Sequence, residues 1–204
     1  FDAAAVLRGE HVVQVYQFAL DDRTGSPYIV MEYVEGASLD DILRSKGTLG
    51  EDDALALIDA AAKGLHEAHG HGLIHRDFKP GNVMVPYEGS FVAAKVSDFG
   101  LARMVQSGMS QMTGEASHSG TLIYNSPEQF RGSRSLDARG DQYSLAATLY
   151  ECLAGHSLVN PEGDVGWQVT RETGPPIEGI SAVITSALNR ALAKSADDRF
   201  DSVL

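Results

Sequence analysis

Cysteine is almost missing from this sequence of 204 residues, since Cys152 is the only one. A single cysteine excludes an intrachain disulfide, and the sequence has no Cys/His cluster with zinc-ligand spacing. No apolar run approaches the roughly 20 residues that cross a bilayer. The N-terminal residues FDAAAVLRGE lack the basic start and apolar core of a signal peptide. These absences favour a protein of the reducing cytoplasm.

Positive charge is also scarce: 16 Lys and Arg stand against 28 Asp and Glu, a formal net charge of −12. A general affinity for nucleic acid or anionic lipid is therefore disfavoured, and we expect neither a nucleic-acid partner nor membrane contact from this segment. Any phosphate site must be local. The length and the 43% hydrophobic content fit one globular domain with its own core.

The first part of the chain predicts a small sheet. Residues 11–20 and 26–34 are rich in β-branched and aromatic side chains, and the turn sequence DDRTGS lies between them. The rest has mostly helical periodicity, and Thr48 and Glu51 have the spacing of a capping box. Helices are expected over residues 38–45, 51–69, 141–153 and 181–193. Residues 161–176 are punctuated by Gly and Pro and are expected to be mainly loop.

Two motifs carry the chemistry: HRDFKPGN at residues 75–82 and SDFG at residues 97–100. Phosphoryl transfer requires an Asp near the attacking hydroxyl, a cation near the transferred phosphate, and oxygen ligands for Mg²⁺. Both motifs together supply these groups. Short strands over 82–85 and 91–99 would place the two motifs at opposite ends of one hairpin.

With these motifs in this order, the chain resembles the catalytic domain of bacterial-type (eukaryotic-like, Hanks-type) Ser/Thr protein kinases. The resemblance implies ATP and Mg²⁺ as cofactors, with Mn²⁺ as an alternative ion. It implies that Asp77 is the catalytic base, that Lys79 stabilises the transferred phosphate, and that Asn82 and Asp98 bind the metal and the nucleotide. It also implies protein substrates with Ser or Thr acceptors, and self-association for trans-autophosphorylation as an option.

The resemblance extends to residues with structural roles. GTLIYNSPEQ at 120–129 resembles the end of an activation segment, where Glu128 would pair with Arg199. Asp141 would tie the central helix to the catalytic-loop backbone. The remaining residues implied to hold the loops in place are His75, Phe99, Gly100 and Thr121.

In PYIVMEYVEGASL the family has its adenine-binding hinge. Met31 would be the gatekeeper, and the backbone of Glu32 and Val34 would bond adenine. The alternative is a plain edge strand that runs into a loop.

Arg76 directly before Asp77 indicates activation by phosphorylation, because an Arg at this place can pair with a phosphate. The acceptor candidates in the polar segment 102–120 are Thr113 first, then Ser110, Ser117 and Ser119. The alternative is that they are solvated hydroxyls without a regulatory role.

The expected fold is α+β and protein-kinase-like. Residues 1–34 would be a remnant of the N-lobe, with the end of the helix that carries the ion-pairing Glu and two strands, and residues 35–204 the hinge and helical C-lobe. No Lys precedes Lys46, and the glycines up to residue 36 are isolated, so the Gly-rich loop and the strand Lys of a complete kinase are not among these residues.

Two classes of function remain open. The chain is part of an active kinase and inactive alone, or it is a pseudokinase-type binding or scaffold module. The intact set Asp77, Lys79, Asn82 and Asp98 favours the enzyme, and the Arg76 and Lys79 pattern favours a protein over a small-molecule substrate. Related bacterial kinases continue into a membrane helix and a sensor domain, so anchoring by other regions also remains open.

Overall fold

A computed structural model describes residues 6–88, 90–99, 122–133 and 136–204. Its first sheet is an antiparallel hairpin of β1 (Val15–Leu20) and β2 (Pro27–Met31). Asp21 organises the turn, because its carboxylate accepts hydrogen bonds from the backbone N–H groups of Arg23 and Thr24. The hairpin predicted from the β-branched and aromatic side chains and the turn between them is confirmed, with shorter strands.

The second sheet has three antiparallel strands in the order β3-β4-β5, namely β3 (Gly36–Ser38), β4 (Val83–Pro86) and β5 (Lys95–Val96). The expected hairpin between the two motifs is therefore present. Its second strand is much shorter than predicted, because Phe91–Ala93 forms a 3₁₀ turn. Gly36 is required in β3, since a Cβ there would lie 2.1 Å from the carbonyl oxygen of Val85.

The described helices are α1 (Leu39–Lys46), α2 (Glu51–Gly70), α4 (Pro127–Phe130), α5 (Ala138–Ala154), α6 (Val165–Arg171) and α7 (Ala182–Ala191). The Thr48 capping box is wrong: the N-cap of α2 is Gly50, without a side-chain cap, and three acidic residues in the first turn interact with the helix dipole instead. The expectation that residues 161–176 are mainly loop is corrected by helix α6. The stretch expected to be loop contains a helix because Asp164 caps it through the N–H of Trp167.

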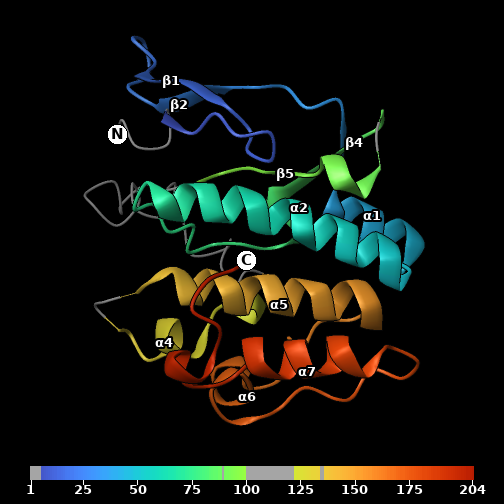
Figure 1. The fold of residues 1–204 in the computed structure, drawn as a ribbon. Helices are drawn as coiled ribbons and strands as arrows, with labels where there is room; N and C mark the ends of the chain where they lie inside the picture. Colours follow the sequence, from blue (N-terminus) through green and yellow to red (C-terminus); the bar gives the residue numbers. More distant parts are fainter. Residues whose placement is uncertain (1–5, 89, 100–121, 134–135) are drawn as a thin grey trace.

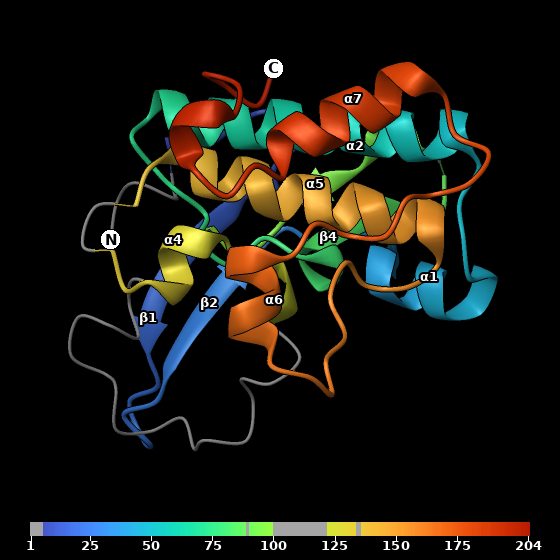
Figure 2. The same cartoon turned by 90° about the horizontal axis from the view of Figure 1, so that it is seen from below.

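The helices form layers. Figures 1 and 2 show α2, α5 and α7 stacked in succession, with the β1–β2 hairpin on the far side of α2. Helix α5 is buried on nearly all sides, so it lacks a polar face; its polar residues Asp141, Gln142, Ser144 and Thr148 are buried too. Among the described helices, none is both long enough and apolar enough to cross a bilayer.

The segment before β1 is described from residue 6 onward. Residues 7–14 form no helix, and the strand predicted over residues 11–20 begins only at Val15. The helix end expected near the start of the chain stays a prediction, because residues 1–5 lie outside the described residues. The segment packs on α2, where the carboxylate of Glu67 accepts hydrogen bonds from the backbone N–H groups of Arg8 and Gly9. Gly64 permits this approach, because a Cβ there would lie 2.4 Å from the carbonyl oxygen of His11.

Candidate active site

The turn after α2 brings three of the predicted site residues together. The Nζ of Lys79 donates a hydrogen bond to the Oδ2 of Asp77 at 2.9 Å, and the Nδ2 of Asn82 donates to the backbone carbonyl of Asp77 at 2.8 Å. The 3₁₀ turn Pro80–Asn82, which begins with the fixed backbone of proline, sets this spacing. The Asp77 carboxylate remains one-third exposed, so it can reach a substrate.

Asp141 of α5 holds this turn through hydrogen bonds to its backbone. Its two carboxylate oxygens accept the backbone N–H groups of His75 and Arg76, each at 2.8 Å, and the Nε2 of His69 lies 2.7 Å from its Oδ2. The side chain is buried, so these charge-assisted bonds hold the loop in one conformation. The connection expected for Asp141 is present, and His69 as a third partner was missed.

His75 joins the two motifs. Its Nε2 lies 2.8 Å from the carbonyl oxygen of Ser97, and its Nδ1 accepts the N–H of Asp77 at 3.3 Å. This pairing requires Nε2 to carry the proton and leaves Nδ1 as the acceptor. The ring packs against Phe99 at 4.9 Å and Phe78 at 5.7 Å between centroids. The turn of residues 75–82 is thus held against residues 97–99.

Arg76 and Asp98 have positive φ angles, 67° and 63°, and no other described residue except glycine does. Such a conformation costs on the order of 1–3 kcal/mol and persists where surrounding contacts determine it. The N–H of Arg76 is bonded to Asp141, and its carbonyl accepts the Nε2 of Gln129 at 2.7 Å. Gln129 was missed, although Ser126 and Gln129 have the spacing of a capping box and the N–H of Ser126 does bond Gln129.

The residues present fit a magnesium ion. The amide nitrogen of Asn82 is used by Asp77, so its oxygen is the group available as a ligand, and Asp98 offers carboxylate oxygens. Oxygen is the donor that Mg²⁺ prefers. Among the described residues no group of three or more His, Cys, Asp or Glu side chains could hold a metal.

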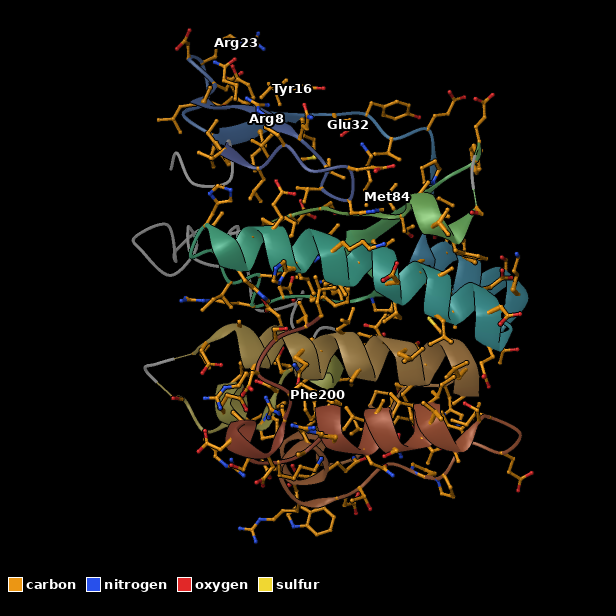
Figure 3. All side chains as sticks on the ribbon, viewed as in Figure 1. Arg8, Tyr16, Arg23, Glu32, Met84 and Phe200 are labelled. Atoms are coloured by element: carbon orange, nitrogen blue, oxygen red, sulfur yellow. The ribbon has the colours of Figure 1, made fainter. Side chains whose placement is uncertain are left out.

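The expected hinge follows β2. Met31, Asp98 and Phe99 line one small cavity together with Val13 and Val15. Glu32 lies between the hairpin and the helical layers (Figure 3), where its carboxylate pairs with Lys95 of β5 at 2.5 Å. Its N–H donates to the carbonyl of Gln14 at 2.8 Å, so this N–H is already occupied. Val34 lies in the connection from β2 to β3.

Glu128 and Arg199 form a bidentate ion pair, at 2.8 and 2.9 Å. The Arg199 side chain is fully buried and also donates to the carbonyls of Ala193 and Arg139. Burial alone would raise the pKa of Glu128, but the hydrogen bonds and charge of Arg199 hold that pKa below its ordinary value. The pair joins α4 to the end of the described chain.

Several predicted residues lie outside the described ranges: Gly100, Ser110, Thr113, Ser117, Ser119 and Thr121. The expectations for them remain predictions.

Comparisons with known proteins identify the family. The family described as "Protein kinase domain" matches residues 2–200. The chain is 39% identical to serine/threonine-protein kinase PknB of Mycobacterium tuberculosis, over 98% of this chain and 32% of the relative, and 34% identical to a probable PknB of Bifidobacterium longum, over 97% and 30%. It thus spans about one third of the length of these curated relatives.

Solved structures agree as well. The kinase domain of M. tuberculosis PknI superposes with a TM-score of 0.75 at 29% identity, covering 99% of this chain and 71% of that domain. The α+β, kinase-like fold expected from the motifs is therefore confirmed. The chain belongs to the protein kinase family and is of the bacterial, Hanks type that comprises Ser/Thr kinases.

Proposed function

We propose that this chain carries the hydroxyl-orienting and metal-binding half of a Ser/Thr protein kinase, which transfers the γ-phosphate of ATP to Ser or Thr hydroxyls of proteins. The observation that carries the proposal is the turn in which Asp77, Lys79 and Asn82 are hydrogen-bonded to one another. His75 holds this turn against the segment that ends in Asp98. The proposed division at residue 34 separates the hairpin from this helical part.

In this mechanism Asp77 accepts the proton of the substrate hydroxyl and orients it toward the phosphate. Lys79, whose ammonium lies 2.9 Å from the Asp77 carboxylate, stabilises the negative charge of the phosphate during transfer. Asn82 and Asp98 hold Mg²⁺ or Mn²⁺, which when bound neutralises the charge of the phosphates. Met31 and the backbone of Glu32 and Val34 would contact adenine; for Glu32 only the carbonyl fits this role, because its N–H is bonded to Gln14.

Regulation by phosphorylation is part of the proposal. Arg76 has a backbone fixed by Asp141 and Gln129, so its position next to Asp77 is well defined. A phosphate on Thr113, or on Ser110, Ser117 or Ser119, would pair with it. We expect mass spectrometry of the active protein to find phosphate on a peptide covering residues 101–121. An unmodified peptide from active enzyme would contradict regulation by phosphorylation in this segment.

The site of action is proposed to be the cytoplasm, where ATP is available. Trans-autophosphorylation would require self-association, and anchoring to a membrane would come from other regions of the parent protein.

The test is a phosphotransfer assay on the protein as the gene encodes it, with Mg·ATP labelled in the γ-phosphate and a mixture of unfolded proteins as acceptors. We expect phosphoserine and phosphothreonine and no phosphotyrosine. Because these 204 residues contain no Gly-rich loop and no Lys before Lys46, we expect the isolated polypeptide to be inactive. Nucleotide binding without transfer by the gene product would favour a pseudokinase-type binding module instead.

A further inference from the structure

A second cavity lies away from the proposed catalytic residues. It has a volume of about 380 Å³ and is bounded by α5, by residues 173–180 and by α7. Its apolar lining includes Leu158, Ile177, Ile180, Leu188 and Leu192, and its polar lining includes Thr185, Asn189 and Lys194. This volume is within the range of small-molecule sites, which are mostly apolar with a few polar groups that fix orientation.

Lys194 is the cation that lines this cavity. Its Nζ lies 3.4 Å from the hydroxyl of the buried Tyr143 and 5.5 Å from the centre of that ring. Among the ion pairs between described residues, none includes Lys194. A lysine that merely extends along the surface keeps its ammonium in water. Here the ammonium instead lies against a buried aromatic ring, and no carboxylate of the described residues pairs with it.

Two arginines, Arg199 and Arg131, also lie near Lys194. Arg199 lies 5.1 Å from the centre of the same Tyr143 ring, and Arg131 donates to the backbone carbonyl of Lys194 at 3.3 Å. Burial, and then the charges of Arg199 and Arg131, lower the pKa of Lys194 to about 8, although Glu172 opposes them. Arg199 is itself paired with Glu128, whereas Lys194 takes part in none of the ion pairs between described residues.

We infer that this cavity binds a small monocarboxylate with an apolar body, with the carboxylate paired to Lys194 and the apolar body against Leu158, Ile177 and Leu188. One ammonium neutralises one negative charge, whereas the apolar lining penalises an anion of higher charge that must lose its water. Neither the family nor the proposed kinase chemistry requires such a ligand, so the inference goes beyond the proposed function.

The binding test uses the protein as the gene encodes it and three probes: 3-phenylpropionate, its uncharged analogue 3-phenyl-1-propanol, and inorganic phosphate. Isothermal titration calorimetry should give binding of 3-phenylpropionate at least roughly tenfold tighter than of the alcohol, because a hydrogen bond to a charged group replaces a neutral one. Phosphate should bind more weakly than the carboxylate. Equal affinity for acid and alcohol, or no carboxylate binding at millimolar concentration, would overturn the inference.

Variants separate the ammonium from the cavity. Lys194→Met keeps the apolar stem and removes the charge, and should weaken 3-phenylpropionate roughly tenfold. The matched control Lys63→Met removes an exposed lysine of α2 and should leave binding unchanged.

A second pair of variants tests the cavity itself. Thr185→Trp fills the cavity from the exposed face of α7 without a change of charge and should abolish binding. Val183→Trp, at an exposed position that does not line the cavity, should leave binding unchanged. Circular dichroism confirms that each variant is folded. Unchanged affinity in folded Lys194→Met, or in folded Thr185→Trp, contradicts the proposed site.

Discussion

The β1–β2 hairpin and the helical layers are built differently. In α5, residues such as Tyr143, Ala147 and Thr148 are at most 1% exposed, whereas in the hairpin Tyr16 is 58% exposed and Val30 41%. Of the hairpin's side chains, Phe18 packs against the main described core cluster. The contacts that hold the catalytic turn also come from the helical side, from α5 and α4. The helical layers therefore determine the geometry of the site, and the hairpin contacts the core through Phe18.

The largest expected effect comes from breaking the buried ion pair of the helical side. Arg199→Met should lower the free energy of unfolding by about 3–5 kcal/mol, because Glu128 would remain as an uncompensated, partly buried charge. Urea unfolding followed by circular dichroism measures it. The control Arg139→Met removes an arginine that pairs with Asp137 and Asp197 nearer the surface, and should cost below about 1 kcal/mol. If both variants lost the same free energy of unfolding, the buried Glu128–Arg199 pair would not stabilise the fold more than the surface pairs of Arg139 do.

The second prediction compares apolar side chains in the two regions. Leu57 of α2 is fully buried, so Leu57→Ala should cost about 2–5 kcal/mol through lost burial and the cavity that remains. Val30→Thr in the hairpin should change the free energy of unfolding by no more than about 0.5 kcal/mol, because the side chain is already exposed. The same urea titration tests both. A cost above about 2 kcal/mol for Val30→Thr would mean that the hairpin is part of the cooperative core.

The smallest expected effect is on the pH dependence of stability. The pKa of Glu128 is lowered in the folded state, so the Glu128–Arg199 pair stabilises the fold fully above the ordinary carboxyl pKa near 4.5. This stability is lost as the pH falls through the lowered pKa, because protonation of Glu128 removes the charge that pairs with Arg199. The difference in unfolding free energy between the protein and Glu128→Gln should therefore be constant from about pH 7 to 5 and shrink below about pH 4. A difference that grows on acidification would contradict the lowered pKa.

Short-range patterns predicted the parts of the fold that local chemistry determines. The 3.6-residue periodicity identified α1, α2, α5 and α7, and the turn residues around Asp21 identified the β1–β2 hairpin. The errors lie where tertiary contacts prevail. The strand predicted over residues 11–20 begins only at Val15, because the residues before it pack on α2, and α6 is a short capped helix within a Gly- and Pro-rich segment.

The residues of the candidate site could be predicted, and the resemblance also named Asp141 and His75 as supports, but His69 and Gln129 were missed. HRDFKPGN and SDFG named Asp77, Lys79, Asn82 and Asp98 through resemblance. The bonds from His69 to Asp141 and from Gln129 to Arg76 join residues 72 and 53 positions apart, which no local pattern connects. The positive φ of Arg76 and Asp98 is likewise a result of packing, because neither residue type prefers that conformation as glycine does.

The most direct test of the account separates the roles of Asp77 and Asp98 in the protein as the gene encodes it. Asp77→Asn should lower kcat for phosphotransfer by at least about 10²-fold and leave the Kd of Mg·ATP unchanged, because in the proposed mechanism Asp77 acts on the substrate hydroxyl. Asp98→Asn should lose both transfer and the dependence of nucleotide affinity on Mg²⁺. Full activity in Asp77→Asn, or an unaltered Mg²⁺ dependence in Asp98→Asn, would contradict the account.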